Sequence, residues 1–159
     1  MSPPKAKPKT IVPPKVFPTD RTPRTVVPDI SSSIQLHPVF SFRYADRENR
    51  GDWVWPTGTE TDRFMNFLCD MNRSTWGQIR TQEYGNEGKR HRKHHGQPFD
   101  SVCNSAQKLI STLKLDEIFD ELFRFRLDSR TRLWGFESSG VFYVLWWDAN
   151  HKVCPTEVS

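Results

Sequence analysis

The last third of the chain, residues 122–155, constrains the fold most, because three β-type runs follow one another there with only short polar turns between them. The first run alternates apolar residues with Arg124 and Arg126, which is the period of a half-buried strand. Residues 132–137 form the second run, and the third, residues 141–147, is apolar on both faces, as in the interior of a sheet. The segment therefore predicts an antiparallel three-stranded meander whose apolar face must be covered by another layer.

Shorter patterns upstream predict the elements that cover this meander. Residues 39–44 alternate, and residues 53–55 read Trp-Val-Trp, so we expect an N-terminal β-hairpin that Pro56 ends. Three helices with apolar residues at helical spacing are expected at about residues 59–71, 74–79 and 100–113. The resulting order predicts an α+β fold with the helices packed on one face of an antiparallel sheet.

The N-terminal segment differs from the rest of the chain in composition. Nine of the twelve prolines lie within residues 1–38, where large apolar residues are few. Such a segment cannot bury enough surface to offset the entropy lost when it becomes ordered. We therefore expect a disordered, proline-rich tail over residues 1–33 and a single α+β domain over residues 34–159.

The positive charge is also concentrated in the tail. Residues 1–30 carry six Lys and Arg against two Asp, a net of +4 that equals the net charge of the whole chain. Residues 31–159 are therefore formally neutral, and the sequence pI of about 9.1 does not indicate a basic domain. Net charge alone thus gives no argument for a nucleic-acid partner.

Targeting and cysteine patterns favour the cytoplasm. No apolar run reaches the roughly 18–20 residues of a membrane span, and no apolar segment follows the N-terminal lysines as in a secretory signal. The three cysteines, Cys69, Cys103 and Cys154, are odd in number and widely spaced, unlike a disulfide framework. We expect a cytoplasmic protein with no membrane partner and no cofactor.

A dense basic run, Lys89 to His95, places four fixed cations and three imidazoles within seven positions. It lies within residues 82–98, which contain three glycines and no aliphatic residue and therefore predict a long loop. The cations can hold phosphates with release of counterions, and the histidines can act as acid or base near neutral pH. The alternative is a solvated loop. The residues predicted to contact nucleic acid are Lys89, Arg90, His91, Arg92, Lys93, His94, His95 and Lys152.

The spacing of the histidines also allows a metal site to be considered. Two of them can share a zinc ion if another ligand completes the site. The candidate ligands are His91, His94, His95, Cys103, Cys154 and His151. The sequence contains neither a paired Cys-x-x-Cys nor a His-Glu-x-x-His motif, so no metal site is predicted.

A second group of cations lies on the predicted meander. Arg124 and Arg126 stand two residues apart and share one face of the first strand, and Arg132 joins them if the strand register allows. Planar guanidiniums suit phosphodiester oxygens, and His151, just past the last strand, is placed to transfer a proton. The predicted catalytic residues are His151, Arg124, Arg126 and Arg132. The alternative is that the arginines pair with the nearby Asp116, Glu117, Asp120 and Glu121.

The two adjacent tryptophans of the last strand raise the question of a partner. Trp146 and Trp147 point to opposite faces, so a single helical layer covers only one of them. The other needs a second cover, a ligand or a partner, and we expect a protein-binding surface there. Asp148 follows directly and is expected to accept hydrogen bonds from backbone amides two residues on, which is a structural role.

The C-terminal residues carry a resemblance to a family. From Ser105 to Pro155 the chain resembles uncharacterised small bacterial and phage proteins that end in Trp-Trp-Asp-x-x-His-x-Val-Cys-Pro. The matching residues are Phe125, Arg126 and Leu127, then Arg132, Leu133, Trp134 and Gly135, then Trp146, Trp147, Asp148, His151, Val153, Cys154 and Pro155. The resemblance covers about a third of the chain and implies no particular activity.

The chain is also similar in its predicted topology to the RelE and HigB toxin ribonucleases of toxin–antitoxin pairs. Those enzymes place helices before an antiparallel sheet that carries cations, and they cleave messenger RNA without a metal. The resemblance implies an RNA-binding endoribonuclease in which Arg124, Arg126 and Arg132 hold the phosphate and His151 is the acid or base. The alternative hypothesis is a non-catalytic module that binds a protein through an exposed aromatic sheet face near Trp146 and Trp147.

Overall fold

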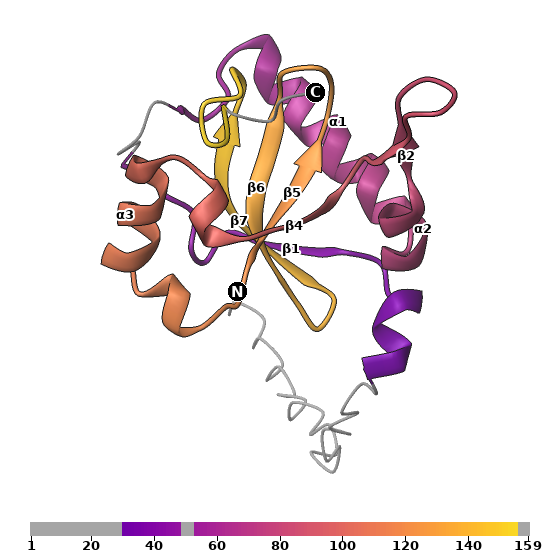
Figure 1. The fold of residues 1–159 in the computed structure, drawn as a ribbon, viewed down its shortest axis with the longest axis horizontal. Coiled ribbons are helices and arrows are strands. Elements are labelled where there is room, and N and C mark those ends of the chain that lie inside the picture. The colour runs from indigo at the N-terminus through magenta and orange to yellow at the C-terminus, as the bar shows by residue number, and fades with distance from the viewer. Residues whose placement is uncertain (1–29, 49–52, 156–159) are drawn as a thin grey trace, which may run out of the picture.

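The computed structural model describes residues 30–48 and 53–155 (Figure 1). The described part begins with a 3-10 helix, η1 (Ile30–Gln35), which includes the last residues of the predicted 1–33 tail. The rest of that tail lies outside the described residues.

The central element is a five-stranded mixed sheet in the order β1-β7-β6-β5-β4. Its strands are β1 (Val39–Ser41), β4 (His95–Gln97), β5 (Leu122–Arg126), β6 (Arg132–Ser138) and β7 (Val141–Asp148). The neighbouring pairs are antiparallel except β1 and β7, which are parallel. The α+β class and the C-terminal meander β5–β6–β7 predicted from the sequence are confirmed.

The three helices lie close to their predicted positions. They are α1 (Thr59–Arg73), α2 (Trp76–Thr81) and α3 (Asn104–Thr112). Thr75 and Gln78 form a reciprocal capping box that starts α2, because each side chain satisfies a backbone amide of the other. Two further 3-10 turns are η2 (Phe99–Ser101) and η3 (Leu115–Glu117). Within the described residues, no helix is long and apolar enough to cross a membrane.

The helices cover both faces of the sheet, which differs from the single helical layer expected from the sequence (Figure 1). Successive residues of β5 show the reason: Leu122 is buried in a core with α3, whereas Phe123 is buried in a core with α1 and α2. Side chains alternate across a strand, so a strand that is apolar at consecutive positions needs cover on both sides.

Both tryptophans of β7 are core residues. Trp146 is 1% exposed and lies on the α3 side, where its ring centroid is 4.6 Å from that of Trp53. Trp147, also 1% exposed, packs edge-on against Phe64 of α1 with the centroids 5.2 Å apart. The exposed aromatic sheet face that the sequence predicted near these residues is therefore wrong, because the second helical layer supplies the missing cover.

The predicted N-terminal hairpin is replaced by a different arrangement. β1 pairs in parallel with β7, Val39 opposite Val141, and Trp53 to Trp55 form no strand. The indole Nε1 of Trp55 instead donates to the carbonyl oxygen of Asp46 at 2.7 Å. The residues from Trp53 to Trp55, whose pattern predicts a strand, are thus held by side-chain contacts rather than by backbone hydrogen bonds of a sheet.

Gly135 explains part of the Trp-Gly motif. The register between β6 and β7 shifts at Trp134 and Gly135, and a Cβ at Gly135 would overlap the carbonyl oxygen of Tyr143 and the ring of Phe142. Only glycine allows the backbones to approach this closely. The glycine of the motif therefore allows the register shift between β6 and β7.

Replacing Trp147 with alanine tests its place in the core. We expect the free energy of unfolding to fall by about 3–5 kcal/mol, because the substitution leaves a large cavity between the sheet and α1. Urea denaturation measures the change, and Val54→Ala, at a position that is 62% exposed, is the control and shifts stability by less than about 0.5 kcal/mol. A loss below about 1 kcal/mol for Trp147→Ala would contradict the buried position.

Candidate nucleic-acid interface

Arg132 is a buried structural residue. It is 1% exposed, and its Nη1 donates to the carbonyl oxygens of Asp128 at 2.8 Å and Thr131 at 3.1 Å. The carboxylate of Asp128 accepts from the backbone amides of Arg130 and Thr131 at 2.6 and 2.8 Å. The guanidinium therefore closes the β5–β6 turn, and its predicted role as a surface phosphate contact is wrong.

Arg124 is also buried, at 1% exposed. It stands opposite His95 in the β4–β5 ladder, and its Nη2 donates to His95 Nε2 at 2.8 Å. Because a guanidinium only donates, His95 Nε2 is the acceptor in this contact, and His95 Nδ1 donates to the Gly96 carbonyl oxygen at 2.6 Å. The predicted phosphate contact at Arg124 is wrong for the same reason as at Arg132: cover on this side of the sheet excludes the side chain from solvent.

Arg126 remains at the surface. Its side chain is half-buried, and its Cζ lies 3.7 Å from the centroid of the Tyr84 ring. Tyr84 belongs to β2 (Glu83–Tyr84), which pairs with β3 (His91–Arg92) to form a separate two-stranded hairpin. Of the three arginines predicted to bind phosphate, only Arg126 is accessible.

His94 fixes the base of this hairpin to the sheet. Its ring is 1% exposed, and its Nδ1 accepts from the backbone amide of Arg126 at 3.1 Å. Its Nε2 then donates to Gln82 Oε1 at 3.2 Å. Burial, followed by the positive charges of Lys93 and Arg124 and by His95, lowers the pKa of His94 to about 3. His94 is therefore neutral at physiological pH, and the predicted phosphate contact at His94 is wrong.

His151 occupies the turn after β7 and is half-buried, with φ at 59°. Asp148 closes the turn, because its two carboxylate oxygens accept from the backbone amides of Lys152 at 2.8 Å and Val153 at 2.9 Å. The structural role expected for Asp148 is confirmed, although the amides that donate to it lie four and five residues on rather than two. Because Arg124 and Arg132 are buried, the four predicted catalytic residues do not form one solvent-exposed group.

The segment predicted as a long loop is largely structured. Besides the β2–β3 hairpin, it contributes β4, which forms an edge of the main sheet. Gly85 and Gly88 have φ values of 115° and 88°, which few other residues adopt, and they allow the hairpin to turn. The apolar periodicity that identifies buried strands is missing here because β4 and the hairpin are polar, so these strands could not be predicted from the sequence.

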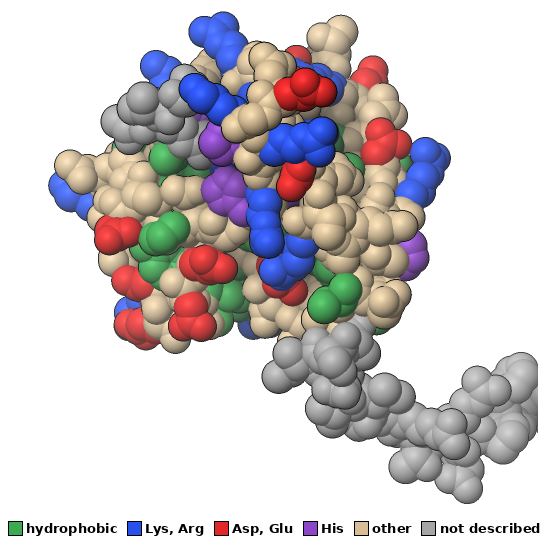
Figure 2. Space-filling model, turned by 45° about the vertical axis from the view of Figure 1, so that its right-hand side comes forward, with side chains coloured by type: hydrophobic (Ala, Val, Ile, Leu, Met, Phe, Trp, Pro, Cys, Tyr) green, Lys and Arg blue, Asp and Glu red, His purple; other side chains and the backbone are tan. Residues whose placement is uncertain are grey.

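The hairpin presents most of the predicted cations to solvent. Lys89, Arg90, His91 and Arg92 are exposed, and Lys93 is half-buried. Glu83 lies 3.8 Å from Arg90 and offsets part of the charge. Lys and Arg side chains gather over the upper and middle part of the face in Figure 2, the side of the molecule on which the hairpin lies. This cationic hairpin, residues 83–92 with Lys93, is the candidate interface.

The register of the hairpin gives it two different faces. Tyr84 stands opposite His91, and Glu83 stands opposite Arg92, so the aromatic pair and the charged pair lie on opposite sides. Sequence reasoning identified the cations but missed Tyr84. No local pattern signals its contact with Arg126, because that contact joins residues 42 positions apart through the tertiary fold.

The structure also bears on the metal interpretation and on pockets. Among residues 30–48 and 53–155, no group of three or more His, Cys, Asp and Glu side chains is arranged to hold a metal ion.

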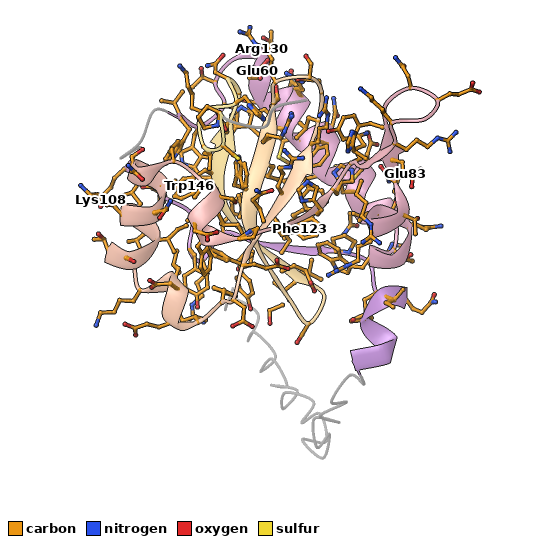
Figure 3. The ribbon with its side chains drawn as sticks, viewed as in Figure 1. Glu60, Glu83, Lys108, Phe123, Arg130 and Trp146 are labelled. Atoms are coloured by element: carbon orange, nitrogen blue, oxygen red, sulfur yellow. The ribbon has the colours of Figure 1, made fainter. Side chains whose placement is uncertain are left out.

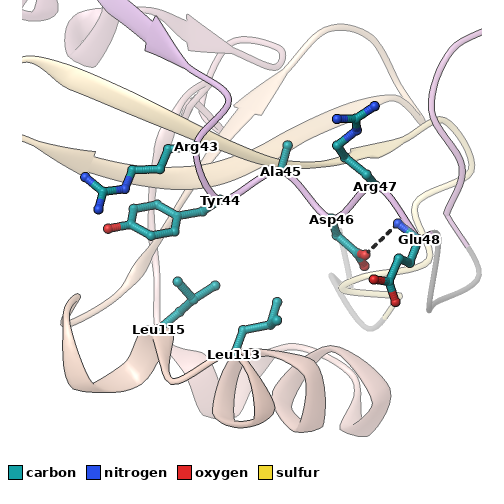
Figure 4. Close-up of a pocket in the computed structure, with 8 residues that line it drawn as sticks. All are labelled: Arg43, Tyr44, Ala45, Asp46, Arg47, Glu48, Leu113 and Leu115. Carbon is teal, nitrogen blue, oxygen red and sulfur yellow. Dashed lines mark hydrogen bonds between the residues drawn. The ribbon is translucent and has the colours of Figure 1, made fainter.

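One pocket of about 330 Å³ lies between residues 43–48 and the end of α3 (Figure 4). Its buried Asp46 is held by Trp146 Nε1 at 3.2 Å and by the Glu48 amide at 3.3 Å, so this carboxylate has structural partners. None of the predicted site residues lines this pocket.

Comparisons with protein-family models, with curated proteins and with solved structures found no match to this chain. The resemblances to the Trp-Trp-Asp family and to the toxin ribonucleases therefore stay predictions.

The pKa of His94 predicts acid-sensitive stability. In the unfolded chain His94 binds a proton near pH 6.5, whereas in the folded chain it does so only near pH 3. The contribution of neutral His94 to stability is therefore fully present above pH 6.5 and is lost as the pH falls toward 3. Between pH 7.5 and 4.5 we expect the wild type to lose about 2–3 kcal/mol more than His94→Asn, which cannot titrate. Urea denaturation at both values measures this difference.

The control for this experiment is His37→Gln, a change at an exposed histidine. It is expected to keep the acid sensitivity of the wild type. Equal losses in the wild type and in His94→Asn would contradict the lowered pKa of His94, because they would show that proton binding by this residue does not differ between the folded and unfolded states.

Proposed function

We propose that this protein binds RNA through the cationic hairpin and the neighbouring Arg126. The observation that carries the proposal is the exposure of Lys89, Arg90 and Arg92 on one structured projection. Residues 83–93 contain four Lys and Arg against two Glu. A local cluster of this kind attracts a phosphate backbone even when the rest of the domain is neutral, because each phosphate contact releases bound counterions.

The hairpin is held in place, which distinguishes it from a freely solvated charged loop. The Lys93 amide donates to the Gln82 carbonyl oxygen at 2.8 Å, and His94 connects Gln82 to the backbone of β5. Arg126 stacks on Tyr84 from the sheet side. A fixed array of cations loses less conformational entropy when it binds than a mobile loop does, which favours affinity.

The proposal is limited to binding. The ribonuclease mechanism predicted from the sequence uses Arg124, Arg126 and Arg132 on one phosphate, and two of these, Arg124 and Arg132, are buried. Lys152 is exposed in the turn after β7 and adds one more cation outside the hairpin. The protein-binding alternative rested on an exposed tryptophan, and both Trp146 and Trp147 are buried.

Neutralising two hairpin cations tests the proposal. We expect Lys89→Gln with Arg92→Gln to lower the affinity for a 12-nucleotide RNA about tenfold at 100 mM salt, because two phosphate contacts are lost. The slope of log K against log salt should also fall by about 1.4, which is two contacts at about 0.7 each on a single strand. Fluorescence anisotropy across a salt series measures both quantities.

The matched control is Lys108→Gln with Lys114→Gln, which removes two exposed cations near α3. Figure 3 shows Lys108 on the opposite side of the molecule from Glu83 of the hairpin. This control is expected to leave the affinity and the salt slope nearly unchanged. Equal losses in both double variants, or no RNA binding by the wild type, would overturn the proposal.

A further inference from the structure

Three flat groups meet on one face of the hairpin. Tyr84 and His91 are cross-strand partners whose ring centroids are 5.7 Å apart at an interplanar angle of 37°. The guanidinium of Arg126 lies over the Tyr84 ring, 3.7 Å from its centroid. The group, here called the aromatic cluster, therefore joins the hairpin to β5: the guanidinium lies over the phenol ring, and the imidazole packs against that ring at a tilt.

The aromatic cluster has one accessible member. His91 is exposed, whereas Tyr84 and Arg126 are half-buried, so the imidazole presents aromatic surface to solvent and the other two groups support it. His94, three residues on, differs: it is buried, and both of its ring nitrogens are hydrogen-bonded within the fold. Position 91 is thus the histidine of the basic run that is available to a ligand.

The positions of Arg90 and Arg92 relative to the aromatic cluster suit one kind of nucleic acid. Arg92 lies on the opposite face of the hairpin from His91, and Arg90, which lies near Glu83, shares that opposite face. An RNA strand that crosses the edge of the hairpin can therefore direct a base toward the His91 imidazole and its phosphates toward Arg90 and Arg92. Only an unpaired strand offers a free base face, because a duplex already uses its base faces for internal stacking.

We infer that the hairpin recognises single-stranded RNA by stacking a base on His91, with Tyr84 and Arg126 as the support and Arg90 and Arg92 on the phosphates. This inference rests on the proposed RNA binding and specifies its substrate. Stacking of a base on an aromatic side chain contributes about 1–3 kcal/mol, which corresponds to roughly 5- to 150-fold in affinity. The interaction tolerates different bases, since each base has a flat face.

Variants of His91 test the inference in the full-length protein. A 12-nucleotide single-stranded RNA carrying 2-aminopurine near its centre reports stacking by its fluorescence, and anisotropy reports affinity. We expect His91→Ala to weaken single-strand binding at least fivefold and to abolish the 2-aminopurine change at saturation, with the salt slope unaltered. His91→Phe keeps a flat ring and should retain both signals.

A base-paired RNA of equal phosphate number is the comparison ligand. The wild type should bind it more weakly than the single strand, and His91→Ala should leave this weaker binding unchanged. Equal affinity for both RNAs, together with no effect of His91→Ala, would overturn the stacking inference and leave the proposed cationic binding in place. Absence of binding to either RNA would overturn both.

A change at the supporting ring gives a second test. Tyr84→Leu removes the ring that contacts both the imidazole and the Arg126 guanidinium, while it keeps every hairpin cation. We expect a loss of single-strand affinity similar to that of His91→Ala, with thermal unfolding checked to confirm that the domain is folded. An unchanged affinity in folded Tyr84→Leu would contradict the role of the aromatic cluster in supporting His91.

Discussion

Burial of both faces of β7 is the constraint on which the rest of the structure depends. Trp146 and Trp147 are each 1% exposed although they point in opposite directions, so the strand must lie between two apolar layers. The α1–α2 pair provides one layer, and α3 with Trp53 provides the other. β1 extends the sheet within its plane, because it pairs in parallel with the outer edge of β7 and so leaves both faces to the helices. This parallel pair makes the sheet mixed.

This double cover also determines what the polar residues of the meander do. Arg132, Arg124 and Asp148 lie near strand ends or an edge, and each is 1% exposed. Buried polar groups must find partners, and these three bind turn carbonyls, an imidazole and backbone amides respectively. Arg132 and Asp148 therefore stabilise strand ends, and Arg124 links β5 to the edge strand β4. Most of the predicted nucleic-acid contacts that remain exposed lie instead on the β2–β3 hairpin, which projects beyond the sheet (Figure 1).

The hairpin and the sheet are joined by a small set of polar contacts. His94 receives the Arg126 amide, and Arg126 in turn covers Tyr84. The neutral state of His94 is part of this junction, since its Nδ1 must accept a hydrogen bond. Structural stability and the proposed binding surface thus share the same residues, so substitutions at the junction need folding controls.

The sequence by itself determined the elements that local patterns encode. Apolar periodicity placed α1, α2 and the meander, and composition alone located the cationic run from Lys89. Alternation also put Arg124 and Arg126 on one face of β5 correctly. Only the tertiary structure decided whether that face is covered, and hence that Arg124 is buried while Arg126 reaches Tyr84. The physical reason is that periodicity reports which side chains share a face, whereas burial and stacking depend on segments distant in the chain.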